Sequence, residues 1–167
     1  EEVARIQGYD LIPSTCPRII ARPDIDDTNL QANKIKNVLI NLGLNEAVTY
    51  SLVDRGIFKA FDIDTSHVIE IENPLSRDQE ILRPSLVPSL ARCVAHNLNQ
   101  RQDYVNIFEI SKVFSRASEA DFTEEQTLGI VLCGEKKTLL EEGLIKEPIG
   151  ILHIKGVVEK FLVSMGA

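Results

Sequence analysis

Long apolar runs, secretion signals and a starting methionine are all missing from this sequence of 167 residues. A membrane-spanning helix needs about 18 or more consecutive apolar residues, and no such run occurs. No basic start leads into an apolar segment, which argues against a signal peptide. Because the chain begins with Glu1-Glu2, we expect it to be a piece excised from a longer protein.

Residues that commonly bind metals are scarce, with only three cysteines and three histidines. They are Cys16, Cys93, Cys133, His67, His96 and His153. The odd number of widely spaced cysteines is typical of reduced thiols in a cytosolic protein, and no metal-ligand spacing joins them to the histidines. The acidic cluster Asp24, Asp26 and Asp27 favours turn and helix-start chemistry over a metal site.

Positive charge is in deficit, since 18 basic residues stand against 25 acidic ones and the net charge is −7. Binding nucleic acid over the whole surface requires clustered lysine and arginine, so this charge argues against it. The charge does not exclude a local basic patch. Its candidate members are Arg77, Arg83, Arg92, Arg101 and the pair Lys136-Lys137. Most of these are expected to be solvated surface charges.

The overall composition is that of an ordinary globular domain, with 44% hydrophobic and 26% charged residues. These values exclude disordered and collagen-like chains. The length suffices for one sizeable core, or for one domain with a fragment of another.

A proline-containing connector is predicted to follow a short N-terminal helix. Residues 1–8 have the pattern of a helix end, with Val3 and Ile6 on the apolar side and Gly8 as the stop. Residues 9–26 lack a helical period and are expected to be extended. We therefore place a domain boundary in this connector and divide the chain into residues 1–22 and 23–167.

Three further segments have the period of amphipathic helices. The first follows a capping-box pattern from Thr28 to Gln31 and ends at Gly43. Its apolar face comprises Ala32, Ile35, Leu39 and Leu42. The second is capped by Ser85 and tolerates Pro88 in its first turn. Its apolar stripe comprises Leu86, Leu90, Cys93, Val94 and Leu98. The third has the clearest pattern, which comprises Ile154, Val157, Val158, Phe161, Leu162 and Met165.

Strand patterns lie between the helices, together with a predicted short helix at residues 54–61. Residues 46–52 alternate and predict a half-buried strand with Val48, Tyr50 and Leu52 on one side. Residues 68–71 predict a short strand. Residues 104–114 and 127–133 are apolar on both faces, which places them in the middle of a covered sheet. Because no regular βαβ alternation occurs, the predicted fold class is α+β, with a largely antiparallel sheet covered by helices.

Motifs of nucleotide-binding, hydrolytic and metal enzymes are missing from the chain. No G-x-G-x-x-G, P-loop, G-x-S-x-G or H-E-x-x-H pattern occurs. The segment from Asn73 to Leu86 predicts a tight turn, a loop and a helix start. Arg83 precedes that helix, and two roles are open: contact with an anion or partner, or an internal salt bridge. Spacing alone favours the salt bridge.

Five short blocks along nearly the whole chain resemble one family in order. The first is Glu1-Glu2-Val3-Ala4-Arg5-Ile6 with Gly8-Tyr9-Asp10 and Ile12-Pro13. The second is Leu42-Gly43-Leu44-Asn45-Glu46 with Thr49-Tyr50-Ser51-Leu52. The third is Asn73-Pro74-Leu75-Ser76 with Leu82-Arg83, Ser85-Leu86, Pro88 and Leu90. The last two are Phe108-Glu109-Ile110 with Val113-Phe114, and Lys155-Gly156-Val157-Val158-Glu159. Together they resemble the bacterial phenylalanyl-tRNA synthetase beta subunit, and residues 135–153 are the least similar stretch.

The resemblance implies the end of a helical DNA-binding-like module at residues 1–22 and the N-terminal part of a class II aminoacyl-tRNA synthetase-like core at residues 23–167. In the family this core is non-catalytic and packs on the alpha subunit. The chain's own residues agree, because Ile107 rather than arginine precedes Phe108-Glu109 and no glycine-rich arginine motif occurs. Adenylyl transfer depends on such positioned cations.

The resemblance also implies cofactors and partners. The family's magnesium site combines upstream aspartates with a Glu-Glu pair, which assigns Glu1 and Glu2 as metal ligands, although they form only half a site in this chain. ATP would bind to the alpha subunit. The implied assembly is a cytoplasmic alpha2-beta2 phenylalanine–tRNA ligase that also binds tRNA, in which the fragment is inactive alone. The helical faces at residues 27–43 and 86–98 are expected to contact the alpha subunit and the opposite protomer, unless they form ordinary core.

Two alternatives stay open at this point. One is a free-standing adenylate-forming enzyme that uses Arg83 or Arg101 to bind ATP. The other is a regulatory synthetase-like paralogue that binds an enzyme partner or an amino acid.

Overall fold

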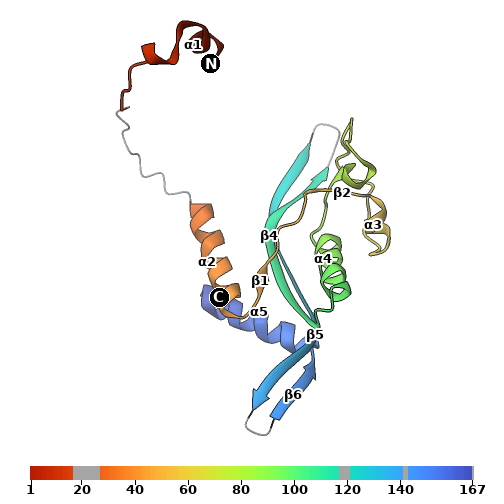
Figure 1. Cartoon of the computed structure of the whole chain (residues 1–167). Coiled ribbons are helices and arrows are strands. Elements are labelled where there is room, and N and C mark those ends of the chain that lie inside the picture. Colours follow the sequence, from red (N-terminus) through yellow and green to blue (C-terminus); the bar gives the residue numbers. More distant parts are fainter. Residues whose placement is uncertain (17–26, 117–120, 141–142, 167) are drawn as a thin grey trace.

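The strands are short in the first half of the chain and longer in the second, in a computed structural model that describes residues 1–16, 27–116, 121–140 and 143–166 (Figure 1). The helices are α1 (Glu2–Gln7), η1 (Tyr9–Leu11), α2 (Asp27–Asn41), α3 (Gly56–Lys59), η2 (Arg77–Gln79), α4 (Val87–Asn99) and α5 (Ile151–Met165). The strands are β1 (Asn45–Glu46), β2 (Leu52–Val53), β3 (Ile81–Leu82), β4 (Tyr104–Arg116), β5 (Phe122–Leu140) and β6 (Gly143–Pro148). None of the helices in the described ranges combines the length and the apolar character that a membrane span requires.

The main sheet has the strand order β1-β4-β5-β6. β4 and β5 pair antiparallel from Tyr104↔Gly134 to Arg116↔Phe122, and β6 is antiparallel to β5. β1 alone is parallel to its neighbour, β4. The prediction of an α+β fold with a largely antiparallel sheet is confirmed, as is the central position of the two long apolar strands.

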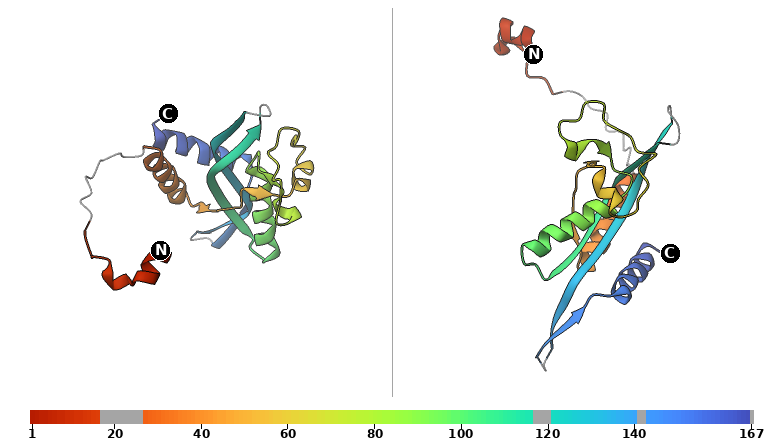
Figure 2. Two further views of the ribbon diagram at one scale, coloured as in Figure 1. Left: turned by 90° about the horizontal axis from the view of Figure 1, so that it is seen from above. Right: turned by 90° about the vertical axis from the view of Figure 1, so that its right-hand side faces the viewer.

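Helices cover both faces of this sheet, which explains why β4 and β5 are apolar on both sides. Ile107 and Val131, paired across the strands, pack in a cluster with Leu90 of α4. The next pair, Phe108 and Ile130, faces the other way and joins a cluster with residues of α2 and α5. Figure 2 (left view) shows α4 on one side of the sheet and α2 with α5 on the other. Successive residues of a strand point to opposite faces, so each long strand serves two cores.

α4 begins and packs much as its sequence predicts. Ser85 lies one residue before the N-cap position, and its Oγ accepts a hydrogen bond from the Val87 N–H at 3.3 Å. Pro88 lies in the first turn, where no intrahelical partner for an N–H is needed. A glycine beneath the helix permits its close approach to β5, because a Cβ at Gly129 would lie 2.6 Å from Leu90 Cδ1.

The predicted half-buried strand at residues 46–52 is wrong. Two separate short strands, β1 and β2, stand at its ends, and the segment between them is irregular. Val48 is 86% exposed and Tyr50 79% exposed, whereas Thr49 bonds to the side chain of Glu109. The alternation of apolar residues therefore predicted the wrong inward face, because a polar contact fixes Thr49 toward the sheet.

A small second sheet, β2 with β3, forms its own core with α3. That core comprises Val53, Phe58, Val68 and Ile81. The strand predicted at residues 68–71 is reduced to an isolated bridge between Glu70 and Ile81. The short helix predicted at residues 54–61 is present but spans only Gly56–Lys59.

The N-terminal helix is confirmed as α1, which ends at Gly8 with a φ of 96°. Residues 9–11 form η1 rather than extended chain. The predicted boundary after residue 22, together with Asp24 and Asp26, lies outside the described residues, as does the side chain of Thr28. The division into two domains therefore stays a prediction.

β6 has no counterpart among the predicted strands, and α5 begins three residues before Ile154, the first residue of its apolar pattern. β5 pairs with β4 as far as Gly134 and from Glu135 onward with β6. Gly134 has a φ of 102°, and a Cβ there would lie 1.9 Å from the Asp103 carbonyl oxygen. At this residue β5 changes its neighbouring strand from β4 to β6, and only glycine adopts the required backbone conformation without strain.

Replacing Gly134 with alanine should therefore destabilise the chain by at least about 2 kcal/mol, because backbone strain and a backbone clash act together. Urea unfolding measures this change. Gly156→Ala in α5 is the matched control, since a Cβ there meets nothing within 4 Å and alanine favours a helix by up to about 1 kcal/mol. Equal stability of the two variants would contradict the assignment.

Candidate functional site

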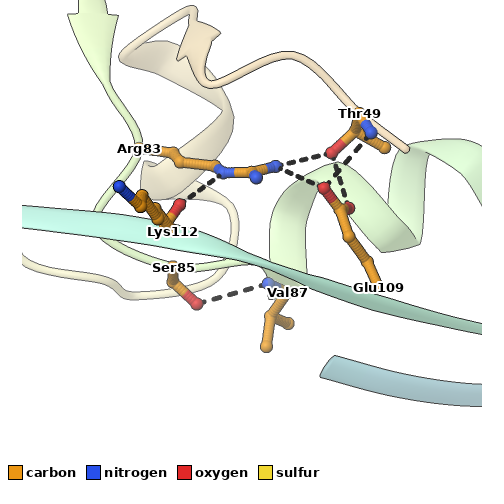
Figure 3. A network of polar contacts seen from close by, with 6 residues as sticks. All are labelled: Thr49, Arg83, Ser85, Val87, Glu109 and Lys112. Atoms are coloured by element: carbon orange, nitrogen blue, oxygen red, sulfur yellow. Dashed lines mark hydrogen bonds and ion pairs between the residues drawn. The ribbon is translucent and has the colours of Figure 1, made fainter. Parts of the chain in front are cut away.

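Arg83 lies directly after β3, and its side chain is 0% exposed. Its Nε donates to the Lys112 carbonyl oxygen at 3.1 Å, and its Nη1 donates to Thr49 Oγ1 at 2.7 Å. Nη1 also lies 3.0 Å from Glu109 Oε1, which forms an ion pair (Figure 3). The guanidinium is thus bound on two sides by the chain itself.

Glu109 completes this network from β4. Its side chain is 2% exposed. Oε1 accepts the Thr49 backbone N–H at 3.2 Å, and Oε2 accepts the Thr49 hydroxyl at 2.7 Å. The Thr49 hydroxyl therefore donates to the glutamate while it accepts from Arg83, so one side chain connects both charges.

The backbone N–H and the backbone carbonyl of Arg83 are both hydrogen-bonded as well. Its N–H donates to the Ser51 carbonyl at 2.9 Å, and its carbonyl accepts the Phe114 N–H at 3.0 Å. A buried charge is costly unless it is paired and hydrogen-bonded, and here the two charges pair with each other. Arg83 Nη2 is the exception, because it is buried without a hydrogen-bond partner among the described residues. Of the two interpretations of Arg83, the internal salt bridge is confirmed.

A cavity of about 550 Å³ adjoins the network, and Thr49 forms part of its wall. Ser89, Arg92, Cys93 and His96 line it from α4. Its walls also include exposed Tyr50. The cavity wall is therefore mostly apolar, with a few polar groups. Arg83 is not one of the residues that line it.

The other basic candidates are scattered over the described surface. Arg77 is exposed in η2, and Arg92 is exposed on α4. Arg101 is exposed after α4 with a φ of 64° and lines a separate cavity of about 500 Å³ with Lys136 and Lys137. The structure therefore does not combine Arg83 and Arg101 in one site.

Lys137 is paired rather than free. Its Nζ donates to Asp103 Oδ2 at 2.7 Å. This hydrogen bond lowers the pKa of Asp103 and raises the pKa of Lys137, and the attraction between the two charges adds to both effects. Asp103 thus neutralises one of the two neighbouring lysines.

Glu1 and Glu2 are both exposed at the start of α1, and Glu2 forms an ion pair with Arg5. Among the described residues, no group of three or more His, Cys, Asp or Glu could hold a metal ion. Mg²⁺ requires near-octahedral coordination by oxygen atoms. The residues present therefore do not fit a complete magnesium site, and their metal role stays a prediction.

Sequence reasoning gave no role to Thr49 or Glu109, although the structure makes both central. A signal was present for Glu109, because it stands in a strand among Ile107, Phe108 and Ile110. Glutamate is almost never buried without a partner, so a charge in such a strand indicates an unrecognised ion pair.

Comparisons with known proteins agree on one family. The family described as "Phenylalanyl tRNA synthetase beta chain CLM domain" matches residues 12–167. The phenylalanine–tRNA ligase beta subunit of Staphylococcus epidermidis is 34% identical over 163 residues, which are 96% of this chain and 20% of that protein. The Staphylococcus haemolyticus protein is 35% identical with the same coverage. The chain spans about a fifth of the length of these curated relatives.

Solved structures show the same type of fold. PylSc, a pyrrolysyl tRNA synthetase from Desulfitobacterium hafniense, superposes with a TM-score of 0.61 at 19% identity. The match covers 83% of this chain and 45% of that one. At this identity the likeness shows the fold alone, which is that of the class II synthetases.

The buried pair predicts a characteristic response to mutation. Arg83→Met should lower the free energy of unfolding by about 3–5 kcal/mol, because it leaves Glu109 charged and buried without its partner. The double variant Arg83→Met/Glu109→Met should be more stable than the sum of the single changes predicts. Additive effects in urea unfolding would show that the two side chains do not act as a pair.

Proposed function

Because the chain belongs to the phenylalanyl-tRNA synthetase beta-chain family, we propose that it is a non-catalytic structural and assembly segment of the beta subunit of phenylalanine–tRNA ligase. The whole enzyme attaches phenylalanine to its tRNA with ATP. In this proposal the alpha subunit binds ATP and carries the active site, and the segment described here supports it.

The state of Arg83 is the observation that carries the non-catalytic role. Transfer of an adenylyl group requires cations that face the substrate phosphates. Arg83 instead bonds to Thr49 and Glu109 within the chain. Ile107, at the position before Phe108-Glu109, is buried against α4.

The two alternative functions are less well supported. A free-standing adenylate-forming enzyme would use Arg83 or Arg101 on ATP, but the first is occupied and the second lies at a separate surface. A regulatory paralogue is disfavoured because the curated relatives are beta subunits that match 96% of the chain.

The apolar faces of both helices that the sequence suggested as assembly surfaces are ordinary core. The apolar face of α4 packs on the sheet through Leu90 and Val94, so it is core. The predicted face of α2 packs in the same way through Ile35, Leu39 and Leu42. Outside that face, α2 leaves Leu30 55% and Ile40 51% exposed. We therefore assign the outer face of α2 as a contact with the alpha subunit in a cytoplasmic alpha2-beta2 enzyme whose tRNA contacts lie mostly outside this segment.

The magnesium proposal depends on the longer parent protein. Glu1 and Glu2 would supply part of a site that upstream aspartates complete and that is shared with the alpha subunit. The carboxylates suit this ion, since Mg²⁺ prefers oxygen ligands.

Co-expression with the alpha subunit tests the assembly role. The chain should co-purify with it, and Leu30→Lys/Ile40→Lys should abolish capture because charges would face an apolar contact. Leu75→Lys is the matched control, since Leu75 is 97% exposed in a loop and belongs to no proposed interface. Failure of the unaltered chain to bind, or full capture of the double variant, would refute the role. Amino-acid-dependent pyrophosphate exchange by the chain alone would favour the free-standing enzyme instead.

A further inference from the structure

Cys93 lines the cavity of about 550 Å³ that adjoins the Arg83 network. It is a free, half-buried cysteine of α4, and Asn97 Nδ2 donates to its Sγ at 3.7 Å. The volume of the cavity lies in the range of about 300–1,000 Å³ that is usual for small-molecule sites. Nothing in the proposed assembly role uses this thiol or this cavity.

Ser89 lies one turn before Cys93 and lines the same cavity. Only 9% of the residue is exposed, and its hydroxyl makes no hydrogen bond to the described part of the chain. Side-chain polar groups that are buried to this extent almost always have a hydrogen-bond partner. The Ser89 hydroxyl is therefore free to donate to a molecule that occupies the cavity.

Arg92, immediately before Cys93, supplies positive charge to the cavity wall. It is exposed, and it forms no ion pair with any residue that the structure describes. Ser89 belongs to the first turn of α4, a helix of 13 residues, and the first N–H groups of a helix carry partial positive charge. Arg92 and Ser89 together therefore suit a carboxylate, which accepts strong hydrogen bonds from a guanidinium group.

The rest of the cavity wall is mostly apolar. Tyr50, Leu52, Val53 and Ile57 contribute to it. Such side chains pack against the carbon skeleton of a ligand, while a few polar groups fix its orientation. Asp78, the acidic residue among those that line the cavity, suits an ammonium group on the same ligand. The wall thus combines a thiol with groups that suit a charged, partly apolar small molecule.

We infer that Cys93 is a modification site, at which the chain forms a mixed disulfide with a small carboxylate-bearing thiol such as glutathione. The carboxylate accepts hydrogen bonds from Ser89 and Arg92, and the carbon skeleton packs against the apolar wall. The co-reactant is the symmetrical disulfide of that thiol. The inference does not depend on the proposed assembly role.

The reaction is an exchange of disulfide bonds. The Cys93 thiolate, formed by loss of the thiol proton, attacks one sulfur of the small disulfide. A new S–S bond forms to that sulfur as the original S–S bond breaks, and the other half leaves as a thiolate that takes up a proton. Cys93 is thereby oxidised and the small disulfide is reduced, so the step needs no further oxidant.

Treatment of the intact, reduced chain of 167 residues with glutathione disulfide tests the inference. Peptide mass spectrometry follows the three cysteines separately. Cys93 should react about tenfold faster than Cys16, although Cys16 is fully exposed, because a charged hydrogen bond in the cavity holds the reagent near the thiol. Cys133 is the control for burial, since it is also half-buried but lies outside this cavity wall, and it should react more slowly than both. Hydroxyethyl disulfide, which has no carboxylate, should show no preference for Cys93.

Two variants locate the carboxylate. Arg92→Gln should lower the rate at Cys93 about tenfold with glutathione disulfide and leave the rate with hydroxyethyl disulfide unchanged. Ser89→Ala should act in the same way with a smaller effect, about threefold, because it removes a hydrogen bond from an uncharged donor. Arg101→Gln is the matched control, since Arg101 is also exposed but lies outside this cavity wall. Circular dichroism checks that each variant folds.

Three results would refute the inference. In the first, Cys93 reacts with glutathione disulfide no faster than Cys16 does. In the second, Arg92→Gln and Arg101→Gln change the rate at Cys93 equally. In the third, both disulfides prefer Cys93 to the same degree, which would indicate a reactive thiol in a cavity that holds only water and has no carboxylate site.

Discussion

The buried ion pair between Arg83 and Glu109 is the constraint on which the arrangement of the domain depends. It connects three segments that are distant in the sequence: the irregular stretch around Thr49, the start of α4 after β3, and the middle of β4. α4 begins at Val87, four residues after Arg83, so the pair sets where the helix meets the sheet. Breaking it would leave a charge buried without compensation, which a marginally stable domain tolerates poorly.

Hydrophobic periodicity predicted the elements whose position depends on burial alone. The helices around Leu39, Leu90 and Phe161 and the two long strands all follow it, because each packs an apolar face on the sheet. The fold class followed from those strands. The prediction for residues 46–52 was wrong because their position depends on a polar contact rather than on burial. Thr49 points to the sheet and bonds to Glu109, and an alternation of apolar residues does not reveal such a bond. β6 was missed because its pairing with β5 depends on the local exchange at Gly134.

For the candidate sites too, the sequence indicated individual residues but not their partners in the fold. Arg83 could be singled out from its place before a helix, but its partners could not, since pairing across 26 residues of sequence is a property of the fold. The metal candidates Glu1 and Glu2 rest on resemblance to a family, and the described residues add no further ligand. At Arg83 the chain forms an internal ion pair with Glu109.

Hydrogen exchange at the Thr49 amide tests the central claim most directly. This N–H donates to Glu109 Oε1 although its neighbours Val48 and Tyr50 are exposed. We expect slow exchange in the unaltered chain and no change on addition of ATP. Exchange should be much faster in Arg83→Met, which loses the pair that holds Glu109 in place. Fast exchange in the unaltered chain, or a response of this amide to ATP, would contradict the claim that Arg83 serves the fold rather than a nucleotide.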